Sequence, residues 1–210
     1  MDMSTIYEAV VRGDMAAAES GVQEAVGEGT APEVVLNEGL IKAMDEVGTR
    51  FEAGEFFVPE MLIAARAMKA GIAVLRPLLA EAGIEPVGKV VIGTVSGDLH
   101  DIGKNLVGLM LEGAGFEVID VGTDVSADSF VEAVQNEKPQ LLGLSALLTT
   151  TMTGATEVIQ KLNEANIRES VKVMVGGAPV TQAYADQIEA DGYASDAASA
   201  SKKAKELLGL

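Results

Sequence analysis

The only histidine of the chain, His100, lies in a short stretch between an apolar run and a helical pattern. This stretch reads Gly97-Asp98-Leu99-His100-Asp101-Ile102-Gly103 and follows the apolar run 90–95. A neutral imidazole can bind a metal through one ring nitrogen while its other N–H donates to a carboxylate, and Asp98 is close enough in sequence to supply that carboxylate. Gly103 removes a side chain where a bulky group would have to pass. The spacing therefore indicates a ligand site centred on His100.

Nitrogen and sulfur side chains cannot complete a metal site around His100. The sequence has no cysteine and no second histidine, so the usual zinc sites with three or four protein ligands cannot be assembled from these donors. One imidazole is enough only where a macrocycle supplies the other ligands. The alternative is that His100 is a hydrogen-bonded structural residue, as an isolated histidine beside a loop more often is.

The stretch from Asp98 to Gly103 resembles the cobalamin-binding signature Asp-x-His-x-x-Gly of B12-dependent methyltransferases and mutases. The family's signature continues with Ser-x-Leu and Gly-Gly, and Ser145-Ala146-Leu147 and Gly176-Gly177 follow here in the same order. In that family the histidine replaces the corrinoid's own lower base on cobalt, and the displaced nucleotide tail lies beside the other two elements. The resemblance thus implies a cobalamin or related cobamide, bound base-off, with His100 as the metal ligand.

The resemblance also assigns roles to three further residues. In methionine synthase a serine completes a His-Asp-Ser hydrogen-bond relay, and Thr151 occupies the matching position here and keeps the hydroxyl. Thr149, two residues earlier, is expected to be a cofactor-binding residue. The alternative role for Thr149 is helix capping. Tyr193 belongs to a segment similar to the one beside the family's nucleotide tail, although a surface turn is equally compatible with that segment.

From Lys89 onward, apolar runs alternate with amphipathic segments. Strands are predicted over 90–95, 116–121, 141–147, 171–175 and 192–194, and helices over 104–113, 128–136, 154–166, 181–190 and 196–208. This alternation predicts an α/β fold with a doubly wound parallel sheet of the flavodoxin-like or Rossmann-like type. The His100 loop would then emerge at the switch point, where such sheets present ligands.

The first 85 residues have helical periodicity throughout. Helices are predicted over 4–12, 14–26, 33–51 and from about 58 to 79, where Pro77 is expected to kink or shorten the last helix. Short connections favour a four-helix bundle. Glycine and proline in 83–88 indicate a linker, so we expect a helical cap domain over 1–85 and a cobalamin-binding α/β domain over 89–210.

A cluster of apolar residues marks the start of the last helix of this bundle: Phe56, Phe57, Val58 and Met61. For each residue alone, a hydrophobic staple or a core position is the alternative. The segment resembles the helical cap that precedes the cobalamin domain in methionine synthase and methylotrophic corrinoid proteins. There, such side chains cover the upper face of the corrin, so the resemblance implies a dry lid that shields reduced cobalt and its methyl group from water.

Composition argues against several classes of function. A net charge of −17 opposes binding to nucleic acid, and no stretch approaches the roughly 18 apolar residues of a membrane-spanning helix. The start of the sequence has no signal-peptide pattern. Residues 93–97 match neither a dinucleotide fingerprint nor a P-loop. We therefore expect a cytoplasmic protein that binds neither nucleic acid nor membranes.

The resemblance covers nearly the whole chain and implies the corrinoid protein of a methyltransferase system. Such a protein shuttles a methyl group through a cobalt(I)/methyl-cobalt(III) cycle and is not catalytic alone. A donor-specific methyltransferase would load it from methanol, a methylamine or a methoxylated aromatic; a second methyltransferase would unload it to tetrahydrofolate or a thiol, and a reductive activase would restore it. The alternatives are a B12-binding sensor or regulatory module, an adenosylcobalamin mutase subunit, and a flavodoxin-like domain without a corrinoid.

Overall fold

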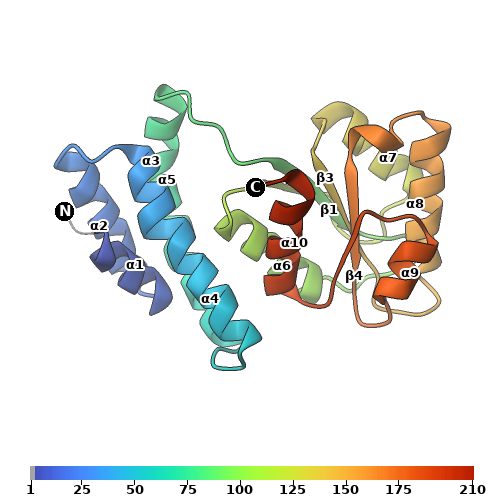
Figure 1. Cartoon of the computed structure of the whole chain (residues 1–210), viewed down its shortest axis with the longest axis horizontal. Helices are drawn as coiled ribbons and strands as arrows, with labels where there is room; N and C mark the ends of the chain where they lie inside the picture. Colours follow the sequence, from blue (N-terminus) through green and yellow to red (C-terminus); the bar gives the residue numbers. More distant parts are fainter. Residues whose placement is uncertain (1–2) are drawn as a thin grey trace. The chain divides into compact units, whose positions relative to one another are not determined.

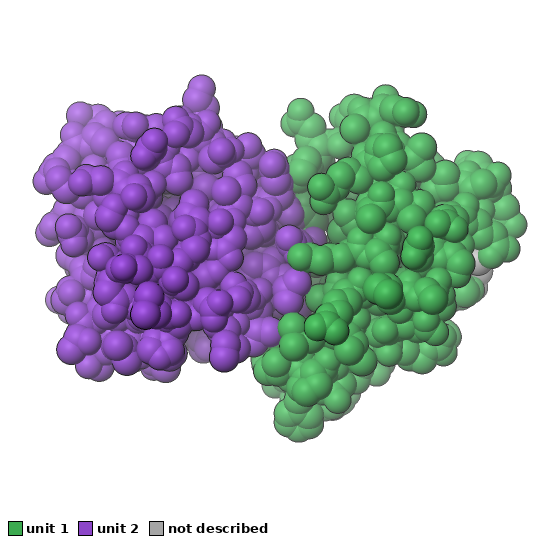
Figure 2. Space-filling model, turned by 180° about the vertical axis from the view of Figure 1, so that it is seen from behind, with its two compact units in different colours: residues 1–86, 113–115 green, residues 87–112, 116–210 purple. Residues whose placement is uncertain are grey.

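Contacts divide the computed structural model, which describes residues 3–210, into two units (Figure 2). The first unit contains the chain up to Pro86 together with Gly113–Gly115, and the second contains Val87–Glu112 and Phe116–Leu210. Met1 and Asp2, part of the segment in which no signal pattern was found, lie outside the described residues. No helix within residues 3–210 is both long and apolar enough to cross a membrane.

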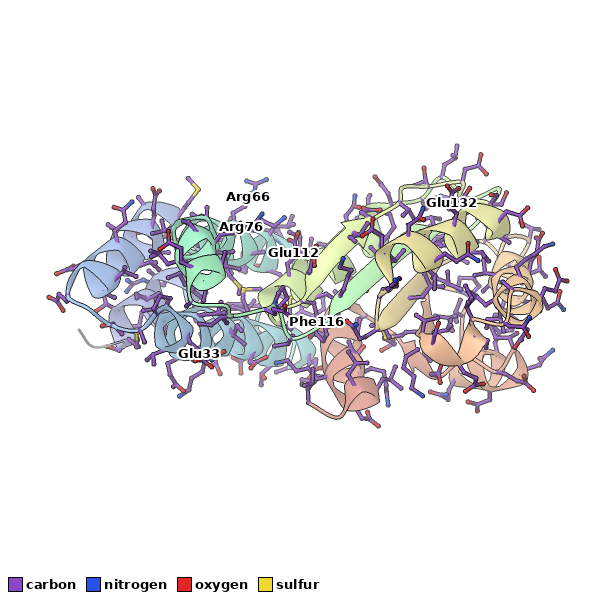
Figure 3. All side chains as sticks on the ribbon, turned by 90° about the horizontal axis from the view of Figure 1, so that it is seen from above. Glu33, Arg66, Arg76, Glu112, Phe116 and Glu132 are labelled. Carbon is purple, nitrogen blue, oxygen red and sulfur yellow. The ribbon has the colours of Figure 1, made fainter. Side chains whose placement is uncertain are left out.

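The first unit is helical, which confirms the predicted bundle (Figure 1). Its elements are α1 (Ser4–Val11), α2 (Met15–Gly27), a continuous stretch of α3 (Pro32–Val34), η1 (Val35–Ile41) and α4 (Lys42–Glu52), and α5 (Val58–Glu81). Asp14 caps α2 by accepting a hydrogen bond of 3.0 Å from the Ala17 amide. Helix α5 continues past Pro77 to Glu81, so the proline does not shorten it. Arg66 and Arg76 of α5 are exposed (Figure 3).

The third helical stretch differs from the regular α-helix expected over 33–51, because η1 is a π-helix. A Cβ atom on Gly39 would lie 3.1 Å from Cγ2 of Ile6, so the backbone of this turn lies directly against α1. The wider turn also buries the neighbouring pair Leu40 and Ile41. A search for a period of 3.6 residues cannot detect this local widening.

The second unit is built on a parallel sheet with the strand order β2-β1-β3-β4-β5. Its strands are β1 (Lys89–Thr94), β2 (Glu117–Asp120), β3 (Leu141–Ser145), β4 (Lys172–Gly176) and β5 (Gly192–Ala194); its helices are α6 (Ile102–Gly113), α7 (Ala127–Glu137), α8 (Thr153–Glu164), η2 (Arg168–Ser170), α9 (Gln182–Gln187) and α10 (Ala197–Leu208). Helices α7, α8 and α9 lie on one side of the sheet, and α6 and α10 on the other (Figure 1). This strand order confirms the predicted flavodoxin-like fold.

Coverage of the sheet on both sides explains why its strands are nearly continuous apolar runs. The core on the α7 and α8 side includes Val91, Leu142, Leu144, Val173 and Val175 from the strands, and Phe130, Val158, Ile159 and Leu162 from the helices. Phe116, just before β2, is also buried, whereas Glu132 of α7 is exposed (Figure 3).

Strand register brings the ends of the strands to one level. Thr94 of β1 pairs with Ser145 of β3, Ser145 pairs with Gly176 of β4, and Gly176 pairs with Ala194 of β5. The loops that follow β1, β3 and β4 therefore leave the sheet side by side. The His100 element lies in the first of these loops, while the Ser145-x-Leu147 and Gly176-Gly177 elements begin at the last residues of β3 and β4 and continue into the loops.

Candidate cofactor site

His100 lies in the loop between β1 and α6 and is oriented by Asp98. The His100 amide donates to Oδ1 of Asp98 at 3.1 Å, and ring atom Nδ1 lies 2.7 Å from the same oxygen. The side chain of Asp98 is fully buried, whereas that of His100 is 52% exposed. Because a carboxylate can only accept, Nδ1 carries the proton and Nε2 of the neutral ring has a free lone pair. The exposed imidazole is thus prepared to bind a metal through Nε2.

The second oxygen of Asp98 is bound by the segment that follows β3. Oδ2 accepts hydrogen bonds from the amides of Leu147 at 2.7 Å and Leu148 at 3.3 Å, and from the hydroxyl of Thr151 at 2.7 Å. Burial acts to raise the pKa of Asp98, but the hydrogen bonds from Thr151, Leu147 and His100 outweigh it and hold this pKa well below its ordinary value. Asp98 is therefore an anion that accepts from the imidazole.

Thr151 completes a continuous series of side chains with Asp98 and His100. Thr151 is only 9% exposed. Its hydroxyl lies 2.7 Å from Oδ2 of Asp98 and 3.0 Å from the carbonyl oxygen of Leu148. The hydroxyl has one proton and can donate to only one of them at a time. The arrangement expected of a His-Asp-Ser relay is therefore present with threonine in place of serine.

The remaining residues of the Ser-x-Leu element lie beside this series. Ser145 is partly buried at the end of β3, and its carbonyl accepts a hydrogen bond of 3.0 Å from the Val95 amide. Leu147 and Thr149 are exposed in the loop that follows. Ser145 thus lies at the end of its strand, while Leu147 and Thr149 offer exposed surface on the loop that binds Asp98.

Gly176 and Gly177 allow two backbones to approach closely. Gly177 has a φ of +121°, and a Cβ atom there would lie 1.9 Å from the carbonyl oxygen of Ala146; on Gly176 it would lie 3.1 Å from that of Ala194. The requirement for glycine at Gly177 is therefore explained by the contact with the loop after β3. Tyr193 lies in strand β5, rather than in a surface turn, and packs partly buried against the core.

The four residues predicted to form the lid differ in exposure. Phe57 is 64% exposed and Val58 is 37% exposed, whereas Met61 is 1% exposed and so presents almost no surface. The ring of Phe56 is partly buried and lies under the guanidinium of Arg50, 5.2 Å from its Cζ atom. Of the four, Phe57 and Val58 offer the most surface.

The surroundings of His100 fit a large apolar macrocycle. Exposed apolar side chains lie in the His100 loop, at the start of α6 and in the loop after β3: Leu99, Ile102, Leu147 and Leu148. A Cβ atom on Gly103 would meet no other atom within 4 Å, so the space around this glycine, three residues after His100, is open. Within the described part of the chain, no group of three or more His, Cys, Asp or Glu side chains could hold a metal ion. A metal here would therefore depend on its own macrocycle and one imidazole.

Four residues near His100 were missed by the reasoning from sequence. The hydroxyl of Thr94, a fully buried residue, donates to the carbonyl of His100 at 2.9 Å. Asp124 accepts from the Gly97 amide at 2.7 Å, and Lys104 forms an ion pair with Asp120. The sequence contains a signal for three of these residues. Thr94 ends β1, Asp120 ends β2 and Asp124 follows β2, and parallel sheets present functional groups at the ends of their strands.

Comparison with known proteins gives consistent matches over almost the whole chain. Two family models, each described as a B12 binding domain, match residues 88–202 and 4–76. A corrinoid protein of Desulfitobacterium hafniense strain Y51 is 43% identical over 99% of this chain and 97% of its own. The dimethylamine corrinoid protein of Methanosarcina barkeri is 50% identical over 89% of this chain and 88% of its own.

Two solved structures are similar in fold. A chain in the methanol:cobalamin methyltransferase complex of Methanosarcina barkeri has a TM-score of 0.87 and 34% identity, covering 99% of this chain and 80% of that chain. A cobalamin-binding protein of Desulfitobacterium hafniense DCB-2 has a TM-score of 0.83 and 31% identity, covering 99% of this chain and 98% of that chain.

Proposed function

The chain belongs to the family of B12-binding corrinoid proteins, and from that premise we propose that it carries a methyl group between two methyltransferases on a bound cobamide. The observation that carries the proposal is the imidazole of His100, which is exposed and bound through Nδ1 to the buried carboxylate of Asp98. The cobalt of the cobamide supplies the atom that accepts and releases the methyl group. In this proposal Nε2 of His100 would bind the cobalt in place of the cofactor's own lower base, so the cofactor would be held base-off.

Asp98 and Thr151 have supporting roles in this proposal. Asp98 fixes the tautomer and orientation of the imidazole, and its negative charge makes Nε2 a stronger donor to a metal. The hydroxyl of Thr151 and the Leu147 amide hold Asp98 in its ionised form. This series therefore adjusts how strongly His100 binds without itself touching the metal.

Other residues bind the rest of the cofactor and exclude water. We place Leu99, Asp101, Ile102 and Gly103 against the macrocycle, and the edge formed by Gly97, Ser145, Leu147, Thr149, Gly176, Gly177 and Tyr193 beside its nucleotide tail. In this proposal the lid segment at the start of α5 would shield the bound cofactor from water, and Phe57 and Val58 offer the apolar surface for this role. Met61 is buried and Phe56 partly buried, so these two would contribute less surface to the lid.

A methylated amine is the first donor to test. The dimethylamine corrinoid protein of Methanosarcina barkeri shares 50% of its residues with this chain over 188 positions, and a chain of the methanol:cobalamin methyltransferase complex shares 34%. In our proposal a donor-specific methyltransferase loads the protein, a second enzyme unloads it to tetrahydrofolate or a thiol, and a reductive activase restores it.

The presence of only one histidine allows a direct test of the proposed ligand. Protein labelled with [15N]histidine is reconstituted with unlabelled hydroxocobalamin and reduced to cobalt(II). Electron paramagnetic resonance then shows which nitrogen binds. A triplet splitting in unlabelled protein that becomes a doublet after labelling identifies His100, and labelling should have no effect on the splitting in His100→Ala. An unchanged triplet would mean that the cofactor keeps its own lower base.

A second experiment tests methyl transfer. Reconstituted and reduced protein is mixed with a dimethylamine-specific methyltransferase and its substrate, with the methanol-specific enzyme as a comparison, and methylation is followed by absorbance. Methylation with either donor system supports the carrier. Cofactor binding without methylation by any donor system would favour the sensor or regulatory module instead.

A further inference from the structure

Lys104 occupies a position that is unfavourable for a lysine in two respects. Its side chain is 2% exposed, although lysine is almost never fully buried unless it is paired. It also lies in the first turn of α6 (Ile102–Gly113), where the helix dipole disfavours a cation. Neither the helix nor the core explains this residue, so the explanation lies with its partners.

The partners of Lys104 connect the end of β2 to the His100 loop. Its ammonium forms an ion pair with Asp120, the last residue of β2, and donates to Oδ1 of Asn105 at 2.8 Å. The Asn105 side chain donates to the Asp101 carboxylate at 3.1 Å, and the Asn105 amide donates to the Asp101 carbonyl at 2.7 Å. The residue that follows His100 is thus tied through Asn105 and Lys104 to the sheet.

The residues that precede His100 are tied to the same part of the fold. Asp124, in the segment after β2, accepts from the Gly97 amide at 2.7 Å, and its own amide donates to the Asp98 carbonyl at 3.0 Å. The hydroxyl of Thr94 fixes the carbonyl of His100 itself at 2.9 Å. The His100 loop is therefore held on both sides, and Lys104 with Asp120 makes the connection on the α6 side.

We propose that Lys104 and Asp120 are positioning residues for His100: their ion pair fixes the start of α6 so that the imidazole stays aligned for axial binding. This inference rests on the proposed role of His100 as the cobalt ligand. Removing the pair loosens the start of α6 and the His100 loop that precedes it, and lowers the fraction of protein in which His100 is bound to the metal. Changes to residues around a metal ligand typically weaken binding by about 10- to 100-fold.

The test uses full-length Lys104→Met and Asp120→Asn, with Lys89→Met as a matched control. Lys89 pairs with Glu117 and Glu137 at the opposite end of β1, and its side chain is 29% exposed. Two signals are measured on each [15N]histidine-labelled protein: the doublet splitting of the cobalt(II) form, and the ring 15N spectrum of the cofactor-free protein at about pH 9, well above the ordinary range of histidine. Neither depends on methyl-transfer activity.

We expect the histidine-bound fraction to fall about tenfold in both variants, and the ring of the cofactor-free protein to lose its single Nδ1–H tautomer, while Lys89→Met behaves as wild type. Unchanged signals in folded Lys104→Met and Asp120→Asn would overturn the inference. If Lys104→Met does not fold, Asp120→Asn decides, because Asp120 is 44% exposed at its side chain. A wild-type protein without histidine splitting would instead contradict the proposed function.

Discussion

At the scale of single residues, Asp98 is the most heavily engaged side chain near His100. It accepts hydrogen bonds from backbone amides, from the hydroxyl of Thr151 and from the imidazole of His100. Bonds to a charged acceptor contribute about 1.5–3 kcal/mol each, so the side chain that orients His100 also stabilises the fold. Variants at this position must therefore be tested for stability as well as for binding.

Thr151→Val should destabilise the cofactor-free protein by about 1.5–3 kcal/mol, because valine keeps the shape of threonine but leaves Oδ2 of Asp98 without its hydroxyl donor. Urea denaturation at neutral pH measures the free energy of unfolding. Thr151→Ser restores the hydroxyl and should recover most of the loss, and the same substitution at the exposed Thr149 serves as the control. Equal stability of Thr151→Val and wild type would show that this hydrogen bond has no net effect.

The depressed pKa of Asp98 predicts a pH dependence with a definite sign. A carboxyl whose pKa is lower in the folded state contributes its full stability above the unfolded value of about 3.9, and loses it as the pH falls towards the folded value. The free energy of unfolding of wild type should exceed that of Asp98→Asn by a constant amount between about pH 5 and 8, and this difference should shrink below about pH 4.

Urea denaturation suits this comparison, because the sequence pI of about 4.3 lies within the pH range and urea keeps the unfolded chain dissolved. The pH dependence of Asp196→Asn can be compared with that of Asp98→Asn, because Asp196 lies away from the His100 loop and its pKa is also lowered. Burial acts to raise the pKa of Asp196, but hydrogen bonds from Ser199 and Ser195 lower it overall. A stability difference for Asp98→Asn that persists undiminished at about pH 3 would contradict the prediction.

At the scale of the elements, the close contact between the loops after β3 and β4 makes Gly177 irreplaceable. Gly177→Ala should destabilise the protein by at least about 2 kcal/mol, because its φ of +121° is strained for alanine and its Cβ would overlap the Ala146 carbonyl. Gly122→Ala is the matched control: its φ is +93°, but a Cβ there meets no atom within 4 Å. Chemical denaturation of both variants separates the overlap from the backbone strain, and equal losses would contradict the prediction.

The order of the elements was predictable from sequence, because buried parallel strands and amphipathic helices have distinct periods. The prediction correctly anticipated the doubly wound sheet and the helical bundle. Asp98 contacts His100 as the spacing implied, and Thr151 contacts Asp98 as the resemblance to methionine synthase implied. The π-helix η1 and the ion pair of Lys104 with Asp120 were not predictable in this way. Both depend on contacts between segments distant in sequence, which a local pattern does not contain.

At the scale of the whole molecule, the net charge of −17 should oppose the folded state. The sequence has 32 acidic and 15 basic residues, and crowding them on a folded surface costs free energy through repulsion. Salt at about 0.5 M shortens the range of this repulsion compared with about 0.01 M. We therefore expect added sodium chloride to raise the melting temperature by about 2–4 °C, equivalent to about 1 kcal/mol.

Choline chloride is the control for this measurement, because screening depends on ionic strength and not on the identity of the cation. Similar increases with both salts would identify general repulsion as the cause. A melting temperature that stays constant or falls as salt is added would show that the ion pairs, such as those of Lys89 and Arg168, outweigh the repulsion.

The two oxygens of Asp98 join segments that are about 50 residues apart in sequence: Oδ1 holds His100, and Oδ2 holds the turn from Leu147 to Thr151. A carboxylate is rigid and planar, so its oxygens move together. If the imidazole moves and Asp98 moves with it, the turn from Leu147 to Thr151 must move as well or lose its hydrogen bonds to Oδ2. Asp98 thus connects the position of the His100 ring to the exposed Leu147 and Leu148. A protein that bound over these two leucines would therefore be sensitive to the position of the imidazole.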